Sequence, residues 1–395
     1  MKKLQGGYTN VLFPADIGGC GHYRMLLPSW GLRTNAKDVR TIESMKLLGD
    51  PQFFRDIRMV RIQRQVSDGQ CQYFLKFLKP LSEAIGFWII YEIDDVISYE
   101  DIPKYNIGRH AFKNENFFSN IQNMLNAANF ITVTTEELKN YYVTKYKIEE
   151  NKFIVIPNYL PRWWAGESYN LRDIMERYNK NKKKPRIGFP ASASHFDLEE
   201  NNNGKDDFTH IVEMIKRTYT KYQYVFIGGF PKQLEHLVQS GQIEVHRGSD
   251  FLNYPRELYA KDLQLIIAPL EDNIFNRCKS NIKLIESWAL GVPVFAQNLP
   301  CYSKYTDMLF DTGEDLEGKI ESFFKDQKKY KATIKKNRRI IDYGDKNAPL
   351  GWWLEKNLQT WYDLFSLPQK TLQIDLTNVK EEISENENEN IKLEL

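Results

Sequence analysis

The segment from residue 265 to residue 296 constrains the fold more than any other part of the chain, because it contains a strand, a polar loop, a helix and a second strand in succession. The apolar run Leu265 to Ala268 has the length of a buried parallel strand, and Pro269 ends it where the sequence becomes polar. A helical segment follows, Gly291 stops it, and Pro293 leads into the next apolar run. The segment therefore predicts a βαβ unit of a parallel sheet.

The helix of this unit is predicted to carry a charged face, because Lys279, Lys283 and Glu286 follow i, i+4, i+7 spacing. Further polar residues around its start are Asn273, Asn276 and Ser280. Open α/β sheets bind nucleotides where a helix starts beyond the carboxyl end of a strand, since free backbone N–H groups and the helix dipole favour anions there. We therefore expect a phosphate-binding site, and the alternative is an ordinary Rossmann-like helix with a solvated Lys/Glu face.

This segment resembles the donor-binding end of the GT-B-fold nucleotide-sugar glycosyltransferases, especially the glycogen-synthase-like retaining group of bacterial and phage type. Glu286 stands just before Ala-Leu-Gly-Val-Pro-Val, where a glutamate of that group holds the ribose of the nucleotide. The group's other glutamate, eight positions upstream, is replaced by Cys278. The resemblance implies two Rossmann-like domains, a nucleotide diphosphate sugar as donor, ribose binding by Glu286, and neutralisation of the leaving phosphates by Lys279.

The composition agrees with a large two-domain enzyme. The chain has 395 residues, of which 42% are hydrophobic and 13% aromatic, and this is too long for one core. A net charge of +2 gives no overall basic field that would require a nucleic-acid partner. The cysteines are scattered without metal spacing, no signal peptide opens the chain, and no apolar run has the length of a transmembrane segment. We therefore expect a cytoplasmic protein with no metal and no cofactor.

The predicted strands define an α/β protein with two Rossmann-like parallel-sheet domains that face each other across a cleft. Strands are expected at residues 10–14, 58–63, 87–91, 130–134 and 153–157, and in the second domain at 186–189, 224–228, 243–246, 265–268 and 292–296. The acceptor-side domain is expected at 1–165 and the donor domain at 185–345, with the polar stretch 178–185 as linker. Residues 346–368 are expected to form a helix packing back on the first domain, and residues 369–395 a disordered acidic tail.

A glycine-rich turn follows the first predicted strand. Glycine lets the backbone approach a ligand closely, so Gly19 and Gly21 are expected to lie near the donor phosphates. His22, Tyr23 and Arg24 are expected to project from the first helical turn towards the cleft, with His22 near the acceptor hydroxyl and Arg24 balancing the diphosphate charge. The alternative is a helix start that needs glycine only for packing.

Two adjacent carboxylates, Asp94 and Asp95, end a hydrophobic strand of the first domain, where side chains enter the cleft. One of them is expected to orient or deprotonate an acceptor hydroxyl. Such a pair also suits a divalent cation, as in the other major glycosyltransferase fold, but that fold does not predict a donor helix near residue 280, so we favour the metal-free interpretation. The alternative is a solvated pair that caps the next segment.

The second domain opens with a strand and a loop of small residues that resembles the Gly-Ser-x-x-His-x-x-Asp-Leu pattern of the family. Ser192, Ser194 and His195 are expected to donate hydrogen bonds to a diphosphate, and a plain surface loop is the alternative. Gly228, after another strand, indicates close passage of a ligand, and Arg247 is expected near the nucleotide base.

The resemblance and these features together predict a glycosyltransferase that moves a sugar from a nucleotide diphosphate sugar, expected to be UDP-linked, to a hydroxyl of a carbohydrate, lipid-linked sugar or modified DNA. Basic runs at residues 180–186 and 325–339, followed by Trp352, Trp353 and Trp361, raise the alternative of a phage-type DNA glycosyltransferase acting on hydroxymethylated bases. The missing first glutamate keeps a second alternative open, a non-catalytic carbohydrate- or nucleic-acid-binding module on the same scaffold.

Overall fold

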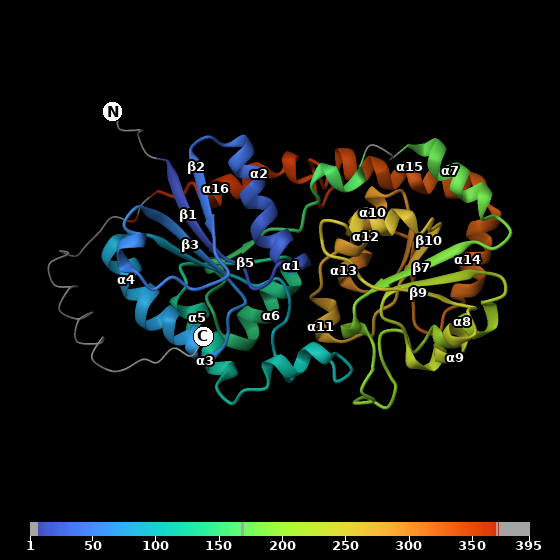
Figure 1. Cartoon of the computed structure of the whole chain (residues 1–395), viewed down its shortest axis with the longest axis horizontal. Helices are drawn as coiled ribbons and strands as arrows, with labels where there is room; N and C mark the ends of the chain where they lie inside the picture. The colour runs from blue at the N-terminus through green and yellow to red at the C-terminus, as the bar shows by residue number, and fades with distance from the viewer. Residues whose placement is uncertain (1–6, 167–169, 369, 371–395) are drawn as a thin grey trace.

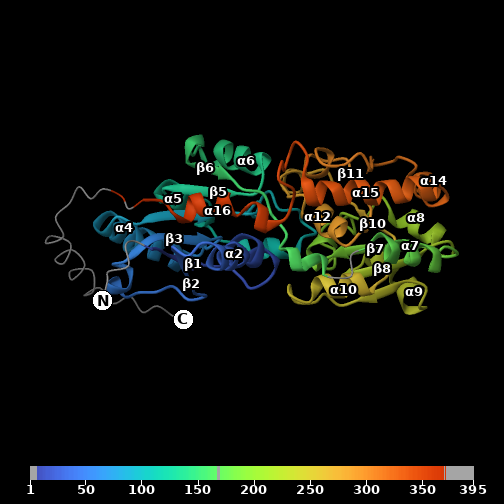
Figure 2. The same ribbon diagram turned by 90° about the horizontal axis from the view of Figure 1, so that it is seen from above.

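The computed structural model describes residues 7–166, 170–368 and 370 of the chain. The strands of this part form two six-stranded sheets, and all pairings within them are parallel. Each sheet lies in its own lobe with helices packed around it, and the two lobes lie end to end (Figures 1 and 2). The expected two-domain α/β fold of Rossmann-like units is confirmed.

The first domain contains a sheet with strand order β2-β1-β3-β4-β5-β6. Its strands are β1 Tyr8–Phe13, β2 Val39–Glu43, β3 Ile57–Gln63, β4 Trp88–Glu92, β5 Phe130–Val133 and β6 Phe153–Val155. Its helical segments are α1 Gly19–Gly21, η1 His22–Leu26, α2 Leu27–Asn35, η2 Pro51–Phe54, α3 Asp68–Gln72, η3 Tyr73–Leu78, α4 Lys79–Ile85, η4 Ile107–Phe112, α5 Phe117–Ala127, α6 Glu136–Tyr146, η5 Glu150–Lys152 and η6 Arg162–Ala165. The central strands are buried on both faces, which explains their nearly continuous apolar sequences.

The second domain contains a sheet with strand order β12-β11-β10-β7-β8-β9. Its strands are β7 Arg186–Ala191, β8 Gln223–Gly228, β9 Glu244–His246, β10 Leu265–Ala268, β11 Val294–Gln297 and β12 Leu309–Phe310. Its helical segments are α7 Leu171–Lys180, η7 Ala193–His195, α8 Val212–Thr218, η8 Lys232–Leu234, α9 Glu235–Gln239, α10 Tyr254–Ala260, α11 Ile274–Arg277, α12 Ile282–Ala289, α13 Pro300–Ser303, α14 Leu316–Lys325 and α15 Gln327–Tyr343.

The chain crosses between the domains twice, and the two crossing segments pair with each other. Leu160 donates its backbone N–H to Trp352 O at 2.9 Å and accepts one from Leu354 at 2.7 Å. After η9 (Leu354–Lys356), helix α16 (Leu358–Phe365) lies on the first domain, where the carbonyl of Phe365 accepts a hydrogen bond from Asn10 Nδ2 at 3.1 Å. The sequence predicted a helix over residues 346–368, and α16 occupies only residues 358–365 of that range. The predicted tail lies, except for Lys370, outside the described residues.

Three sequence-based expectations about the elements differ from the structure. Strands β2 and β12 were not predicted, because the first is a half-exposed edge strand and the second has only two residues. Residues 178–185 do not link the domains: α7 already packs in the second domain, where the rings of Tyr178 and Tyr330 lie 4.5 Å apart. The third difference is the start of α12, which lies beyond Lys279.

Candidate active site

The carboxyl ends of the two sheets meet at the domain interface, and polar contacts join them. Asn158, just after β6, donates to Ser280 Oγ at 3.1 Å. Thr135, after β5, donates to the backbone carbonyl of Cys278 at 3.0 Å. Ligands of open α/β sheets bind at this edge, so the contacts define the candidate site.

Lys279 and Ser280 lie in the turn between α11 and α12, and so the expected helical face that begins at Lys279 is wrong in part. Asn273 caps α11 by accepting from Asn276 N at 2.9 Å, and this short helix ends before residue 278. The ammonium of Lys279 lies 3.9 Å from Asp95 of the first domain and 4.3 Å from the ring centre of Phe275. The turn therefore brings a cation to the interface that a continuous helix would place elsewhere.

Lys283 and Glu286 share one face of α12, as expected, and both are half-buried. Burial lowers the pKa of Lys283 to about 8, with Glu286 opposing the shift. Burial also raises the pKa of Glu286 to about 7, while the hydrogen bond from Tyr23 and the charge of Lys283 oppose that rise. The Lys283 ammonium donates to Pro190 O at 2.5 Å, at the end of β7. The carboxyl of Glu286 thus titrates near neutral pH, a common property of functional groups.

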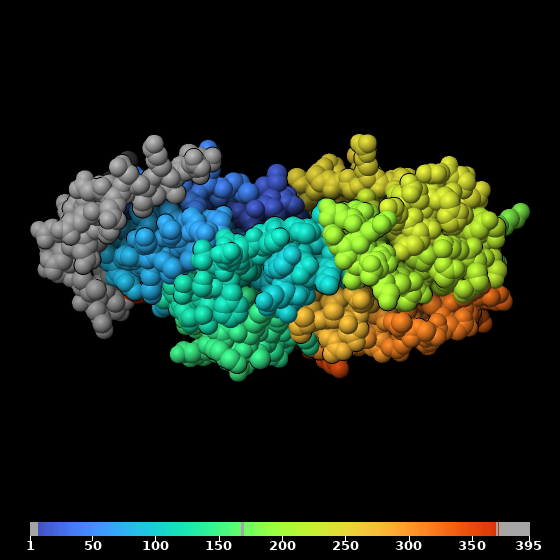
Figure 3. All heavy atoms as spheres, turned by 90° about the horizontal axis from the view of Figure 1, so that it is seen from below, coloured from blue at the N-terminus to red at the C-terminus, as the bar shows by residue number. Residues whose placement is uncertain are grey.

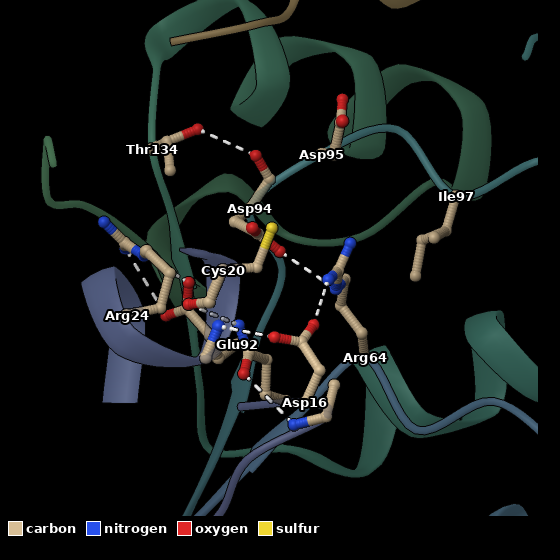
Figure 4. Close-up of polar contacts among 12 residues, drawn as sticks. Asp16, Cys20, Arg24, Arg64, Glu92, Asp94, Asp95, Ile97 and Thr134 are labelled. Atoms are coloured by element: carbon tan, nitrogen blue, oxygen red, sulfur yellow. Dashed lines mark hydrogen bonds and ion pairs between the residues drawn. The ribbon is translucent and has the colours of Figure 1, made fainter. Parts of the chain in front are cut away.

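The glycine turn is organised by Asp16 (Figure 4). One oxygen of this carboxylate accepts the backbone N–H of Gly18 at 2.8 Å and of Gly21 at 3.1 Å. A Cβ on Gly21 would lie 1.8 Å from the carbonyl oxygen of Asp16, so only glycine fits there. Gly19 is exposed with open space around its α-carbon, which leaves its backbone accessible to a ligand.

His22 and Tyr23 reach from the first helix to the second domain. The ring of His22 stacks on Phe251 at 4.3 Å, while its Nδ1 lies 2.9 Å from the carbonyl oxygen of Gly18. The hydroxyl of Tyr23 donates to Glu286 Oε1 at 2.7 Å. His22 is therefore held against the donor domain.

Arg24 does not face the interface, and the expectation that it balances diphosphate charge is not supported by its placement. Its side chain is fully buried in the first domain, with Nε 2.6 Å from Glu92 Oε1. Its other N–H groups donate to Ile156 O, to Asn158 Oδ1 and to Val133 O. Arg24 thus holds strand ends of the first domain together, and its guanidinium is saturated by protein acceptors.

Asp94 and Asp95 have different surroundings. Asp94 is nearly buried, 3.1 Å from Arg64 Nε, and Arg64 also binds Asp16 of the glycine turn at 3.0 Å (Figure 4). Asp95 points to the second domain, where Lys279 is its partner. Burial and the charge of Asp94 raise the pKa of Asp95, while Lys279 opposes them. Asp94 therefore binds Arg64 within the first domain, whereas Asp95 faces the second domain and is able to accept a proton.

The loops of the second domain place the remaining expected residues at the ends of β7, β8 and β9. The hydroxyls of Ser192 and Ser194 lie 2.7 Å apart and are exposed. Gly228 has a φ of +106°, and a Cβ there would meet Ala191 O at 2.3 Å. Arg247 is exposed on the loop after β9. His195 Nδ1 lies 2.6 Å from Asp207 Oδ2.

Several interface residues were missed by sequence reasoning. Asp207 accepts hydrogen bonds from Tyr105 and Asn276 as well as from His195, and Asn276 is fully buried in this role. Asn158 follows a strand end, so the rule that sites lie there would have found it. Nothing local marks Tyr105 or Asp207, because their partners are distant in the sequence. Tyr23 was expected at the cleft, and the structure places it there, bound to Glu286.

The tryptophans and the second basic run, which raised the alternative of a DNA acceptor, can also be located in the structure. Trp352, Trp353 and Trp361 are buried. In the basic helix α15, Lys336 pairs with Asp307 at 2.9 Å and Arg338 with Asp342 at 2.5 Å.

Within the described ranges, no three His, Cys, Asp or Glu side chains are grouped as metal ligands. No helix in the same ranges has the length and apolarity to cross a membrane.

The chain is similar in structure to a solved glycosyltransferase and to a protein solved with UDP and glucose. A glycosyltransferase from Rickettsia africae aligns with a TM-score of 0.60 and 14% identity over 91% of this chain and 98% of its own. Anabaena Alr3699/HepE, in complex with UDP and glucose, aligns with a TM-score of 0.61 and 11% identity over 91% of this chain and all (100%) of its own. The chain has the GT-B fold.

The same fold also occurs in the N-terminal domain of Candida albicans trehalose-6-phosphate phosphatase, with a TM-score of 0.53 and 10% identity over 93% of this chain and 98% of that one. No protein-family profile and no curated protein sequence matches the chain. At these identities the likeness concerns the fold, so any activity must be argued from the residues of the site.

Proposed function

We propose that this protein is a glycosyltransferase that transfers a sugar from a nucleotide diphosphate sugar to a hydroxyl acceptor. The observation that carries the proposal is the group of Lys279, Lys283 and Glu286 at the carboxyl edge of the second sheet, opposite the glycine turn of the first. Two cations suit a diphosphate, and a carboxylate suits the vicinal hydroxyls of a ribose. The position is the one at which α/β sheets bind nucleotides.

A uridine diphosphate sugar is the donor we favour. Alr3699/HepE, which has the same fold, is in complex with UDP-glucose in one of its structures. The donor is proposed to lie against the second domain, with Ser192, Ser194 and Gly228 near the phosphates and Arg247 near the base. Lys279 is proposed to neutralise the charge that develops on the leaving diphosphate, the step at which electrostatic stabilisation matters most.

The acceptor is proposed to approach from the first domain. Asp95 has a raised pKa and lies beside Lys279, so it is the group best placed to take a proton from the attacking hydroxyl. His22 lies in the same interface and is proposed to contact the acceptor. The ion pairs of Lys336 and Arg338 in α15 and the burial of the three tryptophans weaken the case for a DNA acceptor.

Release of the nucleotide diphosphate distinguishes an enzyme from a non-catalytic binding module. The protein is incubated with a panel of nucleotide sugars, with and without simple glycoside acceptors, and nucleotide diphosphate release is measured. We expect turnover with at least one UDP-linked sugar. Binding of a nucleotide sugar without any release, under all acceptor conditions, would assign the protein to the non-catalytic alternative.

Glu286→Gln is expected to weaken nucleotide binding about tenfold, because a neutral amide replaces a carboxylate that accepts ribose hydroxyls. Since the pKa of Glu286 is raised to about 7, its charged form grows as the pH rises through 7. The ratio of the wild-type affinity for UDP to that of the variant should therefore grow over this range, because only the wild type gains the carboxylate charge. Calorimetric titration of UDP at several pH values measures both effects.

Glu257→Gln is the matched control, since Glu257 is half-exposed on α10 of the same domain. It should leave the affinity and its pH dependence unchanged. Equal UDP affinities of wild type and Glu286→Gln would remove Glu286 from the nucleotide site.

Transfer is expected to be independent of added metal, because Lys279, Lys283 and free backbone N–H groups compensate the diphosphate charge. Turnover is measured after dialysis against EDTA and again after addition of manganese or magnesium. Constant rates support the expectation. Loss in EDTA with recovery in manganese would instead make Asp94 and Asp95 candidate metal ligands.

A further inference from the structure

The carboxylate of Asp207 is a buried junction at the domain interface. Its side chain is 1% exposed. Oxygen Oδ1 accepts three hydrogen bonds, from Tyr105 Oη at 2.7 Å, from Glu271 N at 2.7 Å and from Asn276 Nδ2 at 2.8 Å. Oxygen Oδ2 lies 2.6 Å from Nδ1 of His195. Four polar atoms, three at Oδ1 and one at Oδ2, therefore lie within hydrogen-bonding distance of this carboxylate.

Tyr105 belongs to the first domain, so this junction is completed only across the interface. It lies in the segment between β4 and α5, which extends to the second domain. Figure 3 shows this face, where the cyan segment of the first domain lies against green and orange segments of the second. Helix η4 of that segment contacts η7, which contains His195. The imidazole is thus held by a support that both domains build.

The contact with Asp207 determines which ring nitrogen of His195 carries the proton. Hydrogen bonds from His195, Tyr105 and Glu271 N hold the pKa of Asp207 below its ordinary value against the effect of burial, so the carboxylate has no proton to donate. Nδ1 must therefore be the protonated nitrogen. Burial lowers the pKa of His195 to about 4, with Lys283 and Lys279 adding to the fall and Asp207 opposing it. A neutral ring with Nδ1–H has a lone pair at Nε2.

We propose that His195 offers this Nε2 lone pair to the bound nucleotide sugar and accepts a hydrogen bond from one of its hydroxyl groups, so that His195 determines donor specificity and Asp207 positions it. The inference rests on the proposed function. It replaces the expectation that His195 donates to the diphosphate, because ionised phosphate oxygens carry no proton to share and would meet a lone pair. The hydroxyl belongs to the ribose or to the transferred sugar.

Asp207→Asn is expected to switch the tautomer of the His195 ring. Three donors surround Oδ1, so the amide oxygen takes that position and the NH2 group faces Nδ1 of His195. Nδ1 must then accept, and the proton moves to Nε2. Asp206→Asn is the matched control: Asp206 is a buried neighbour that accepts from Phe208 N and Asp197 N and does not contact His195.

Nitrogen-15 NMR of the imidazole rings tests the tautomer without any ligand. The chain has six histidines, and the signal of His195 is assigned by its loss in His195→Asn. We expect a neutral ring with Nδ1–H at pH 7 in the wild type and in Asp206→Asn, and Nε2–H in Asp207→Asn. A wild-type ring that is an imidazolium, or is protonated at Nε2, would overturn the proposal.

Calorimetric titrations with UDP-glucose, UDP and pyrophosphate test the ligand group. Asp207→Asn should weaken UDP-glucose binding tenfold or more and leave pyrophosphate binding equal or tighter, since a hydroxyl loses its acceptor while a phosphate gains a donor. Weakening of UDP-glucose alone assigns a hydroxyl of the transferred sugar. Equal weakening of UDP and UDP-glucose assigns the ribose. Tighter binding of all three ligands would show that His195 contacts phosphate and would overturn the proposal.

If Asp207→Asn does not fold, as judged by its thermal melt, His195→Asn replaces it, because Asn keeps an N–H for Asp207 but lacks the ring nitrogen. It should lose UDP-glucose affinity at least tenfold and keep pyrophosphate affinity, and the reverse pattern would contradict us. A wild-type protein that binds neither UDP nor UDP-glucose would refute the proposed function itself, whereas normal wild-type binding with the wrong tautomer would refute only this inference.

Discussion

Lys279→Ala is expected to lower the turnover number by about a hundredfold, equivalent to about 3 kcal/mol of transition-state stabilisation, with little change in the fold. The physical reason is that the charge on the leaving diphosphate grows in the transition state, where the proposed ammonium contact is strongest. The stability should change little, because the pair with Asp95 is long, at 3.9 Å, and partly exposed. Steady-state kinetics with a saturating donor and a thermal melt measure the two quantities.

Lys325→Ala is the matched control, since Lys325 is 74% exposed on α14 of the same domain. It should keep the wild-type turnover number. Lys279→Arg retains the charge and should recover part of the rate. An unchanged turnover number in Lys279→Ala, under conditions where the wild type turns over, would remove Lys279 from the mechanism.

Glu92→Gln is expected to reduce the free energy of unfolding by about 3–5 kcal/mol, because it leaves two buried guanidinium groups without a counter-charge. Glu92, Arg24 and Arg61 are all fully buried, and Thr132 adds a hydrogen bond to the carboxylate. The ring of Trp361 on α16 lies 4.6 Å from the Arg61 guanidinium carbon. A loss of this size should lower the melting temperature by about 10 °C.

The pH dependence of stability gives a second readout of this cluster. Burial alone would raise the pKa of Glu92, but Arg24 and Arg61 outweigh it and hold that pKa below its ordinary value. The stabilisation is therefore fully present above the ordinary glutamate pKa, about 4.3, and is lost as the pH falls through the lowered folded value. Wild-type protein should lose this part of its stability in acid, and Glu92→Gln should lack that part at all pH values.

Glu150→Gln provides the control for a carboxylate at the surface, because Glu150 is 69% exposed in the same domain. Its effect should stay within about 0.5 kcal/mol. Denaturant unfolding of the three proteins makes the comparison. A melting temperature of Glu92→Gln equal to that of the control would show that the buried cluster does not stabilise the first domain.

The role of Arg24 could not be predicted from the sequence. Its position two residues after His22 on a helix that starts at the glycine turn suggested a contact with phosphate. Its partner is Glu92, which lies 68 residues away at the end of β4. Both side chains are fully buried in the interior of the first domain. No local pattern contains that pairing, because it depends on how β3, β4 and α16 pack together.

Lys279 shows the same limit at a smaller scale. Its spacing from Lys283 and Glu286 satisfies the period of a helix, so a single continuous helix was the simplest interpretation. The cap by Asn273 and the buried hydrogen bonds of Asn276 instead complete a separate short helix before residue 278. The cation still reaches the interface, although from a turn and not from a helix face.

The sequence by itself determined the two parallel sheets and the placement of Lys283 and Glu286 on one helix face. These properties follow from apolar runs, turn residues and helical period, which act over a few residues. Only the tertiary structure decided that Arg24 is a core residue, that Tyr23 binds Glu286, and that Tyr105 and Asp207 hold His195. Burial and hydrogen bonding between groups far apart in the chain set these roles, and they exist only once the two domains are packed together.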